Sequence, residues 1–122
     1  MRYGIMKEKG IYFTVNGVNH FHGIKVFKIN SLMKLVKEPE NNYDDEAIRV
    51  ELRYAGPSGY VANSVKTVAK GSYSAGRLYD KILDVDYAKV KFIIGDAIIA
   101  KVLTSEEVDQ EKSNPDSDIN YI

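Results

Sequence analysis

One segment of the chain, residues 37–50, combines residue types that suit ligand binding with residue types that favour turns. Asn41, Asn42 and Asp44 accept turn geometry and bond their own backbone, so a plain loop between two strands explains most of the segment. A plain loop does not explain Tyr43, because it puts a large ring at the loop tip, where water surrounds it. An exposed ring can stack on the flat face of any nucleobase, and an ionised aspartate accepts from a hydroxyl but repels a phosphate. Tyr43 and Asp44 therefore place a stacking surface beside a hydrogen-bond acceptor at one loop.

The charges of the chain are unevenly distributed. Seventeen basic and seventeen acidic side chains give a formal net charge of zero. Residues 105–122 carry six carboxylates against the single basic Lys112, a charge of −5, which leaves sixteen bases and eleven acids, or +5, in residues 1–104. A positive body can hold phosphates by displacing their counterions, although surface Lys and Arg are by default simply solvated. The cations we select for phosphate contact are Lys37, Arg49, Lys70 and Arg77.

Other arrangements of reactive residues are less complete. His20 and His22 stand two apart in an expected strand and could meet one metal ion, but zinc needs a third protein ligand, for which only carboxylates such as Asp44 are at hand. Residues 71–78 imitate the spacing of a phosphate-binding P-loop but place Arg77 and a leucine where the lysine and the hydroxyl belong. No serine lies in a nucleophile elbow, and cysteine is absent. We therefore expect no enzymatic activity and no cofactor, and a metal-dependent hydrolase is the most remote alternative.

The elements that position these residues are expected to be short strands. Runs of β-branched and aromatic residues are separated by Gly, Asn, Asp and Pro. The alternation of apolar and polar positions over 20–27 and 47–52 is typical of half-buried strands, and Gly95-Asp96 is a two-residue hairpin loop whose glycine can adopt a positive φ. The expected strands are residues 11–15, 20–27, 32–37, 47–52, 60–62, 88–94 and 97–103.

The connections between these strands contain the remaining elements. Residues 56–59 are predicted to break the chain before the brief strand that follows them. Asn63 or Ser64 is suited to cap a short helix that ends near Ala69, and residues 77–83 predict another turn or two of helix. Six or seven short strands with a small helical insert and no βαβ spacing indicate a mainly β protein, a closed or nearly closed antiparallel barrel.

Length and composition bound the remaining classes. A chain of 122 residues fits one domain, which we place at residues 1–104. Residues 105–122 form an acidic tail without periodicity, which is typical of disorder, and the sequence leaves open whether the tail is ordered. The N-terminus shows no signal-peptide core, and no run approaches the roughly 20 apolar residues that cross a bilayer. Together with the lack of cysteine, these features favour a cytoplasmic protein that does not engage membranes.

Three short motifs follow one another along the chain. Residues 17–23 read Gly-Val-Asn-His-Phe-His-Gly, residues 37–44 read Lys-Glu-Pro-Glu-Asn-Asn-Tyr-Asp and lead to Ala-Ile-Arg-Val at 47–50, and residues 59–62 read Gly-Tyr-Val-Ala. Together they resemble the signature of the HIRAN domain family, in which a glycine- and aromatic-containing element precedes acidic-Pro-x-Asn-x-Tyr-Asp, Ala-Ile-Arg/Lys-Val and a Gly-Tyr-Val step. Each motif alone is a weak signal, but their order makes the resemblance specific, and it extends over residues 11–103.

The resemblance implies an OB-like or SH3-like antiparallel barrel that binds the 3′ end of single-stranded DNA without catalysis. In the best understood member of the family, the terminal base lies between two aromatic rings and an aspartate reaches the 3′-hydroxyl. Carried over to this chain, Tyr43 is one stacking ring, His20 stands in the place of the other, and Asp44 accepts from the hydroxyl. The residues implied to line the pocket beside them are Val18, Asn19 and Phe21.

Two positions depart from the family pattern and leave alternatives open. Asn19 stands where the family has an arginine, and Tyr60 stands where a histidine contacts phosphate, so the affinity can be lower or the ligand different. A function of another class is a protein-interaction barrel that binds a peptide through the same aromatic surface. If DNA is the ligand, a separate helicase or nuclease is a candidate partner. The acidic tail is then either a solubilising end or a weak competitor of DNA for the positive body.

Overall fold

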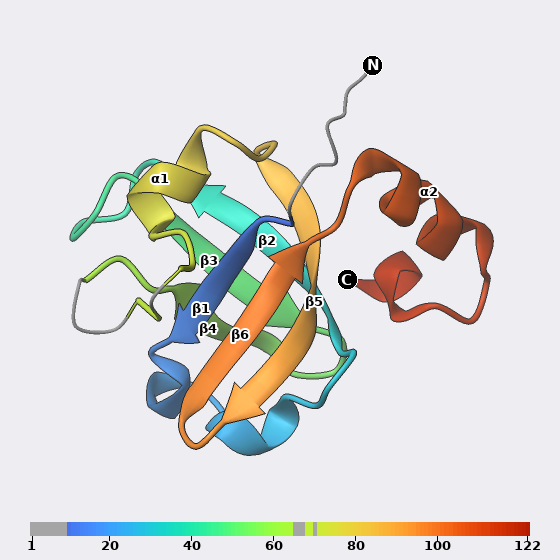
Figure 1. The fold of residues 1–122 in the computed structure, drawn as a ribbon, viewed down its shortest axis with the longest axis horizontal. Helices are drawn as coiled ribbons and strands as arrows, with labels where there is room; N and C mark the ends of the chain where they lie inside the picture. Colours follow the sequence, from blue (N-terminus) through green and yellow to red (C-terminus); the bar gives the residue numbers. More distant parts are fainter. Residues whose placement is uncertain (1–9, 65–67, 70) are drawn as a thin grey trace.

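Six strands close into an antiparallel barrel, with short helices at its two ends and a helical tail against its side (Figure 1). The computed structural model describes residues 10–64, 68–69 and 71–122. The strands are β1 (Tyr12–Asn16), β2 (Leu32–Glu38), β3 (Ala47–Leu52), β4 (Gly56–Val61), β5 (Val85–Ile94) and β6 (Ala97–Val102). The helices are α1 (Ala75–Tyr79), α2 (Ser105–Ser113) and the 3-10 turns η1 (Val18–His20), η2 (Ile24–Val26) and η3 (Asp118–Tyr121). The order around the barrel is β1-β4-β3-β2-β5-β6, which confirms the predicted mainly β, closed-barrel fold.

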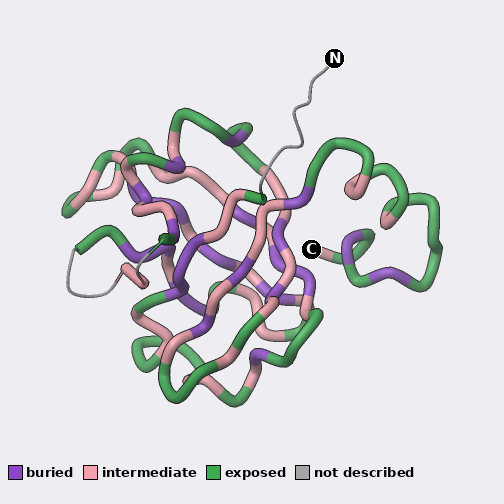
Figure 2. Tube along the Cα trace, in the orientation of Figure 1, coloured by how far each residue is buried: buried purple, intermediate pink, exposed green. Residues whose placement is uncertain are grey.

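The barrel interior is filled by the apolar positions of the alternating strands. Leu35, Ile48 and Val50 are fully buried, and their neighbours along each strand face outward, as a period of two requires. Each such side chain contributes about 1.5–3 kcal/mol of burial. Leu78 of α1 and Phe27 after η2 join the same core, so the short helices cover both ends of the barrel. Figure 2 shows the buried positions running through the strands and the exposed positions at the loops.

Strand β1 closes the barrel because it pairs on both of its sides. Val15 lies opposite Val61 of β4 and opposite Ile98 of β6. The predicted hairpin is confirmed, since β5 pairs with β6 and Gly95 adopts a φ of +58° in the connection. Closure gives each of the six strands two neighbours, which protects their backbone groups from pairing with other chains.

The strand predicted at residues 20–27 is wrong, because this segment forms parts of η1 and η2. Gly17 and Gly23 adopt φ values of +72° and +78°, and these left-handed residues turn the chain before each 3-10 turn. The apolar half of the alternation is still used, since Ile24 and Val26 pack against the barrel core. The alternation therefore reports burial of one side of the segment but not its backbone conformation.

Strand β4 is longer than predicted, because the expected break at residues 56–59 is its first part. The register between β3 and β4 shifts at Val50 and Glu51, and Pro57 pairs just beyond that irregularity, where a residue without an N–H is tolerated. Gly59 is required by a close approach, since a Cβ there would lie 2.9 Å from a valine methyl group of β1. Glycine and proline thus serve strand packing here instead of ending a strand.

The helices between β4 and β5 agree only in part with the prediction. The helix expected at 77–83 overlaps α1 only at residues 77–79. Helix α1 begins two residues earlier, because the Ser74 hydroxyl accepts from the backbone N–H of Arg77 at 3.3 Å, and it ends at Tyr79. The helix expected at 63–69 depends on residues 65–67, which lie outside the described residues. Among the residues that the structure does describe, no helix has the length and apolar character that a membrane crossing requires.

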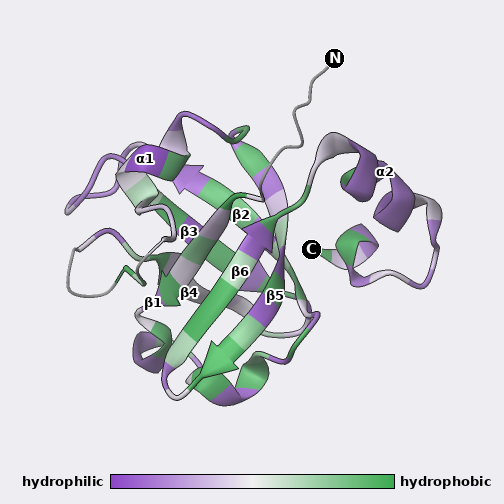
Figure 3. Ribbon diagram, viewed as in Figure 1, coloured by the Kyte–Doolittle hydropathy of each residue, from purple (hydrophilic) through white to green (hydrophobic). Residues whose placement is uncertain are grey.

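The acidic tail is folded, although its composition is typical of disorder, and this answers the question that the sequence left open. Helix α2 begins with a reciprocal cap: the Glu107 N–H donates to the Thr104 hydroxyl at 3.2 Å, and the Thr104 N–H donates to Glu107 Oε1 at 2.9 Å. Two glutamates in the first turn also suit the positive end of the helix dipole. Figure 3 shows why hydropathy gave no signal, since the residues of α2 are mostly hydrophilic.

The tail is attached to the barrel by a small apolar cluster and by ion pairs. Ile119 of η3, only 2% exposed, packs with Leu32 and Leu103. The ion pairs are Lys101–Glu107 at 3.3 Å, Lys89–Glu111 at 3.5 Å and Arg53–Asp118 at 2.9 Å. We call the surface formed by β5, β6 and residues 104–122 the tail face. The tail carboxylates that form these pairs are thus engaged with β5, β6 and the β3–β4 turn.

Candidate nucleic-acid interface

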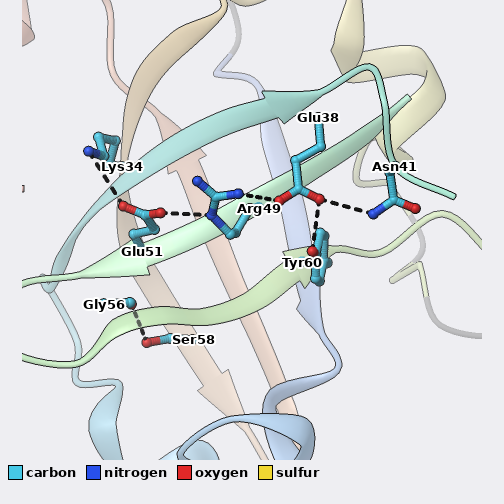
Figure 4. A network of polar contacts seen from close by, with 8 residues as sticks. All are labelled: Lys34, Glu38, Asn41, Arg49, Glu51, Gly56, Ser58 and Tyr60. Atoms are coloured by element: carbon cyan, nitrogen blue, oxygen red, sulfur yellow. Dashed lines mark hydrogen bonds and ion pairs between the residues drawn. The ribbon is translucent and has the colours of Figure 1, made fainter. Parts of the chain in front are cut away.

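The outer face of β2, β3 and β4, together with the loop at residues 39–46, carries a connected network of polar side chains (Figure 4). We call this surface the site face. Glu38 Oε1 accepts hydrogen bonds from the Asn41 amide at 3.0 Å and from the Tyr60 hydroxyl at 2.8 Å. Glu38 Oε2 accepts from Arg49 Nη1, and Arg49 Nε donates to Glu51 at 2.7 Å. The Arg49 guanidinium therefore lies between two carboxylates.

Strand register brings these side chains together. Arg49 of β3 lies opposite Tyr60 of β4 on one side and opposite Val36 of β2 on the other. Because side chains alternate along each strand, Arg49 faces outward while its neighbours Ile48 and Val50 fill the core. The same period places the Tyr60 hydroxyl on the outer face, within reach of β2.

The network fixes the protonation states of its members. Burial alone raises the pKa of Glu38, but hydrogen bonds from Asn41, Tyr60 and Arg49 outweigh it and lower that pKa below its usual 4.5. Burial and the bond to this carboxylate both raise the pKa of Tyr60. Burial lowers the pKa of Arg49, but the two carboxylates outweigh burial and raise this pKa above its usual value. At neutral pH Glu38 is therefore an anion that accepts hydrogen bonds, and Tyr60 is a neutral donor.

Asn41 organises the loop that carries the predicted ligand-binding residues. Its side-chain oxygen accepts from the backbone N–H of Tyr43 at 2.8 Å and from that of Asp44 at 3.1 Å. The turn leaves the ring of Tyr43 98% exposed, as expected for a residue at a loop tip. The backbone of Tyr43 is thus fixed, while both faces of its ring remain open to solvent.

Asp44 is anchored on the opposite side of the loop. Its Oδ1 accepts from the backbone N–H of Glu46 at 2.9 Å, and its Oδ2 accepts from the Asn63 amide at 3.0 Å. Asn63 in turn accepts from the backbone N–H of Gly76 at 2.9 Å, which links the loop to α1. A carboxylate has about four acceptor sites, so these two bonds orient Asp44 and leave capacity for a hydroxyl donor.

The other predicted aromatic positions lie farther along β4. The rings of Phe21 and Tyr60 are 6.1 Å apart and tilted by 43°, and Phe21 is 36% exposed. Val18 approaches the backbone of β4 closely, since a Cβ on Gly59 would lie 3.4 Å from one of its methyl groups. The structure therefore brings Val18, Phe21 and Tyr60 together at the η1 end of the site face.

His20 and Asn19 are exposed on η1, and the described contacts do not join either of them to Tyr43. Asn63, the partner of Asp44, lies three residues beyond Tyr60, which corresponds to roughly 10 Å of extended chain. The predicted residues therefore form two separate groups at different positions along β4. One group is the rings beside η1, and the other is the loop with Tyr43 and Asp44.

The predicted phosphate-binding cations differ in their availability. Arg49 is enclosed by carboxylates, and Lys37, whose side chain is only 12% exposed, lies 3.9 Å from Asp84 and 4.6 Å from the Tyr79 ring centre. Arg77 is exposed and lies over the ring of Tyr73. Lys70 lies outside the described residues. Of the cations that can be placed, Arg77 is the most accessible to a phosphate.

The remaining possibilities raised by the sequence find little structural basis. Because residues 20–27 are not a strand, His20 and His22 do not share a strand face, and a ring nitrogen of His22 lies 2.8 Å from the Ala55 carbonyl oxygen. Within the described parts of the chain, no group of three metal-ligating side chains occurs.

The glycine-rich stretch after residue 70 has a structural role, since the Ser72 hydroxyl is buried and bonded to the Ala69 carbonyl and the Thr14 hydroxyl.

A large groove of the molecule lies away from the site face. It has a volume of about 1060 Å³ and runs between the tail and the barrel. Its apolar lining includes Ile82, Leu83, Val102, Leu103 and Val108, and none of the predicted site residues contributes to it. Cavity size therefore does not identify the candidate site, which is defined by the polar network and the exposed rings.

Sequence reasoning assigned Asn41 a turn-forming role, which the structure confirms, but it gave no role to Glu38 and none in the site to Asn63. Glu38 and Asn41 lie in the Lys-Glu-Pro-Glu-Asn motif, and their spacing of three is a usable signal, because a carboxylate and an amide three apart can bond across a turn. Asn63 left no comparable signal, since its partners are 19 and 13 residues away in the sequence.

A closed barrel that presents exposed rings, an anchored carboxylate and a rigid polar network belongs to the class of small ligand-binding barrel modules. The sequence matches the HIRAN domain family over residues 9–78, more than half of the chain, and the protein is therefore a member of this family. The fold is similar to that in the crystal structure of the HIRAN domain of human HLTF, with a TM-score of 0.51 and 19% sequence identity. That similarity covers 88% of this chain and 90% of the other, and at this identity it establishes the fold alone. No curated protein matches the sequence.

Proposed function

We propose that the protein is a non-enzymatic DNA-binding module that takes the 3′-hydroxyl end of a single strand. The terminal base stacks on Tyr43, and Asp44 accepts a hydrogen bond from the 3′-hydroxyl. Upstream nucleotides pass the rings of Phe21 and Tyr60 and the exposed residues Asn19 and His20. Membership of the HIRAN family and the chemistry of the site face support this proposal.

The observation that carries the proposal is the state of the loop that bears Tyr43 and Asp44. Tyr43 is 98% exposed, and Asn41 fixes the backbone that carries it, so the ring projects into solvent from a defined point of the loop. Asp44 is oriented by Glu46 and Asn63 beside it. An exposed aromatic ring without a ligand gains little for the fold, whereas a fixed loop backbone and a pre-oriented carboxylate reduce the entropy cost of binding.

The experiment compares two oligonucleotides that differ only at the 3′ end, one with a hydroxyl and one with a phosphate. Fluorescence anisotropy at several salt concentrations gives the dissociation constants. We expect tighter binding of the hydroxyl end, because a 3′-phosphate meets the negative charge of Asp44. We also expect affinity to fall with salt, with a slope that counts the phosphates contacted. Equal affinity for the two ends, or no binding at low salt, would contradict the proposal and favour a peptide ligand for the same rings.

A further inference from the structure

One carboxylate on the site face, that of Glu38, is shared by three segments of the chain (Figure 4). Its Oε1 accepts from Asn41 of its own loop at 3.0 Å and from Tyr60 of β4 at 2.8 Å, and its Oε2 accepts from Arg49 of β3. The Glu38 side chain is only 19% exposed, so protein donors rather than water satisfy most of its acceptor capacity.

Through Asn41 the same carboxylate reaches the ligand-binding loop. The Asn41 amide nitrogen donates to Glu38, while its oxygen accepts from the backbone N–H groups of Tyr43 and Asp44. A continuous path of hydrogen bonds therefore runs from the Tyr60 hydroxyl through Glu38 and Asn41 to the backbone of Tyr43. This path connects the two groups of predicted residues on the site face, the rings beside η1 and the loop with Tyr43 and Asp44.

We infer that Glu38 is a positioning residue, which fixes the loop of Tyr43 and Asp44 relative to the ring of Tyr60 by bonding Asn41 and Tyr60 with one oxygen. The inference rests on the proposed function, since it assumes that this loop contacts the DNA end. It also assigns Arg49 a structural role: enclosed by Glu38 and Glu51, the guanidinium holds the carboxylate in place and does not contact phosphate.

The first two variants separate the hydrogen bonds that attach the loop to Glu38, which we call the tether, from the negative charge of Glu38. In Glu38→Ala the Asn41 amide and the Tyr60 hydroxyl lose their common acceptor, so the loop keeps its internal turn but loses its attachment. We expect the ratio of affinities for the 3′-hydroxyl and 3′-phosphate oligonucleotides to fall on the order of tenfold, the size of one charge-assisted hydrogen bond. In Glu38→Gln an amide oxygen can replace Oε1 for both donors, while the ion pair with Arg49 is lost. We therefore expect this variant to keep most of the wild-type ratio of affinities for the two oligonucleotides, which we call the end preference.

Glu51 provides a matched control. It lies on the same face and bonds the same Arg49, with a further ion pair to Lys34 at 3.4 Å, but neither Asn41 nor Tyr60 donates to it. Glu51→Gln removes an equal charge and one partner of Arg49 but leaves the tether intact, with Asn41 and Tyr60 still bonded to Glu38, so the end preference is expected to fall less than in Glu38→Ala. A loss in this variant equal to that in Glu38→Ala, or a Glu38→Gln variant as impaired as Glu38→Ala, shows that charge alone acts and overturns the inference.

A variant in the loop keeps the test decisive if Glu38→Ala does not fold. Asn41→Asp preserves an acceptor for the Tyr43 and Asp44 N–H groups but replaces the donor to Glu38 by a second carboxylate. It is expected to lower the end preference as Glu38→Ala does, with a lower melting temperature because two carboxylates then face each other, and circular dichroism checks that the variant is folded. Wild-type end preference in Asn41→Asp overturns the inference and leaves the proposed function standing. Absence of any end preference in the wild-type protein removes the proposed function itself.

Discussion

The site face and the tail face both join strand cations to carboxylates, but they do so with different geometry. On the site face, Glu38 collects three donors and Arg49 lies between two carboxylates, so each side chain has its position set by more than one bond. On the tail face, the three ion pairs that hold the tail are separate from one another, and α2 has no buried residue. The polar groups of the tail face attach a helix, whereas those of the site face orient a loop.

This difference in geometry indicates that the tail face contributes mainly to the stability of the fold and the site face mainly to ligand binding. Isolated, partly exposed ion pairs contribute about 0–1 kcal/mol each, so the tail depends on the apolar cluster around Ile119 for most of its attachment. The shared bonds of the site face orient groups that remain exposed, above all Tyr43. Substitutions on the tail face should therefore change unfolding, and substitutions at the exposed ring should change binding.

The largest effect is expected from Ile119→Ala on the tail face. Ile119 is 2% exposed and packs with Leu32 and Leu103, so its truncation leaves a cavity and lowers the free energy of unfolding by about 2–5 kcal/mol. Thermal or denaturant unfolding measures this change. The affinity for a 3′-hydroxyl oligonucleotide should not change, because the contacts described for the tail do not involve the site residues.

Asp118→Asn is the control for this substitution. It removes the ion pair of the neighbouring residue with Arg53, and the Asp118 side chain is half exposed, so we expect a loss of no more than about 1 kcal/mol. If the two variants destabilise equally, ion pairs and not apolar contacts attach the tail. If Ile119→Ala instead tightens DNA binding, the tail competes with DNA, as its acidic sequence suggested.

The second effect concerns Tyr43 on the site face. Tyr43→Ala removes the stacking platform, and the affinity for the hydroxyl-ended oligonucleotide should fall by about 1–3 kcal/mol. The melting temperature should stay the same, because the ring is 98% exposed. Tyr54→Ala is the matched control: Tyr54 is 90% exposed, but it lies in the β3–β4 turn, and its ring contacts Arg53. An equal loss of affinity in both variants would mean that binding does not depend on the Tyr43 loop.

The fold was predictable wherever local patterns decide the structure. The strand expected at 47–52 agrees with β3 to the residue, and the hairpin at Gly95 follows from its turn chemistry. The same alternation over 20–27 misled, because left-handed glycines at 17 and 23 convert it into 3-10 turns that still bury one side. The helical tail was missed because few apolar residues mark it, although the Thr104-x-x-Glu107 cap is visible in the sequence.

The site was predictable only in its exposed parts. The position of Tyr43 at a water-exposed loop tip follows from the turn-forming residues around it and is confirmed. The enclosure of Arg49 does not follow from the sequence, because Glu38 is eleven residues away and meets it only through the register of β2 with β3. A count of charges therefore overstates the positive surface, since it cannot tell a free cation from one paired across strands.

A smaller effect is expected from the cap of the tail helix. Thr104→Ala removes the acceptor for the Glu107 N–H and should lower the free energy of unfolding by about 1 kcal/mol. Ser105→Ala at the next position is the control, because the Ser105 side chain makes no cap bond. Circular dichroism during thermal unfolding measures both. Equal stability of the two variants would show that α2 is held by its ion pairs with Lys89 and Lys101 alone.

The smallest effect is a pH dependence that both faces share. Hydrogen bonds outweigh burial and lower the pKa of Glu38, and the Thr104 N–H together with Lys101 lowers the pKa of Glu107. In the unfolded chain each carboxyl has its usual pKa of 4.5, so the unfolded state binds more protons near that pH. The stabilisation by both anions is therefore complete above pH 4.5 and is lost as the pH falls through their lower folded-state values.

Glu38→Gln and Glu107→Gln separate the two contributions to acid unfolding. Each variant should be less stable than the wild type at pH 7, and each difference should shrink as the pH is lowered from 5 towards 3, since the wild-type carboxyl becomes neutral as well. In the double variant the two losses should add, because Glu38 and Glu107 share no partner. Differences that stay constant across this pH range would mean that the side-chain shape and not the anion stabilises that face. A loss that fails to add would mean that the two faces are coupled through the barrel, against the independence on which their comparison depends.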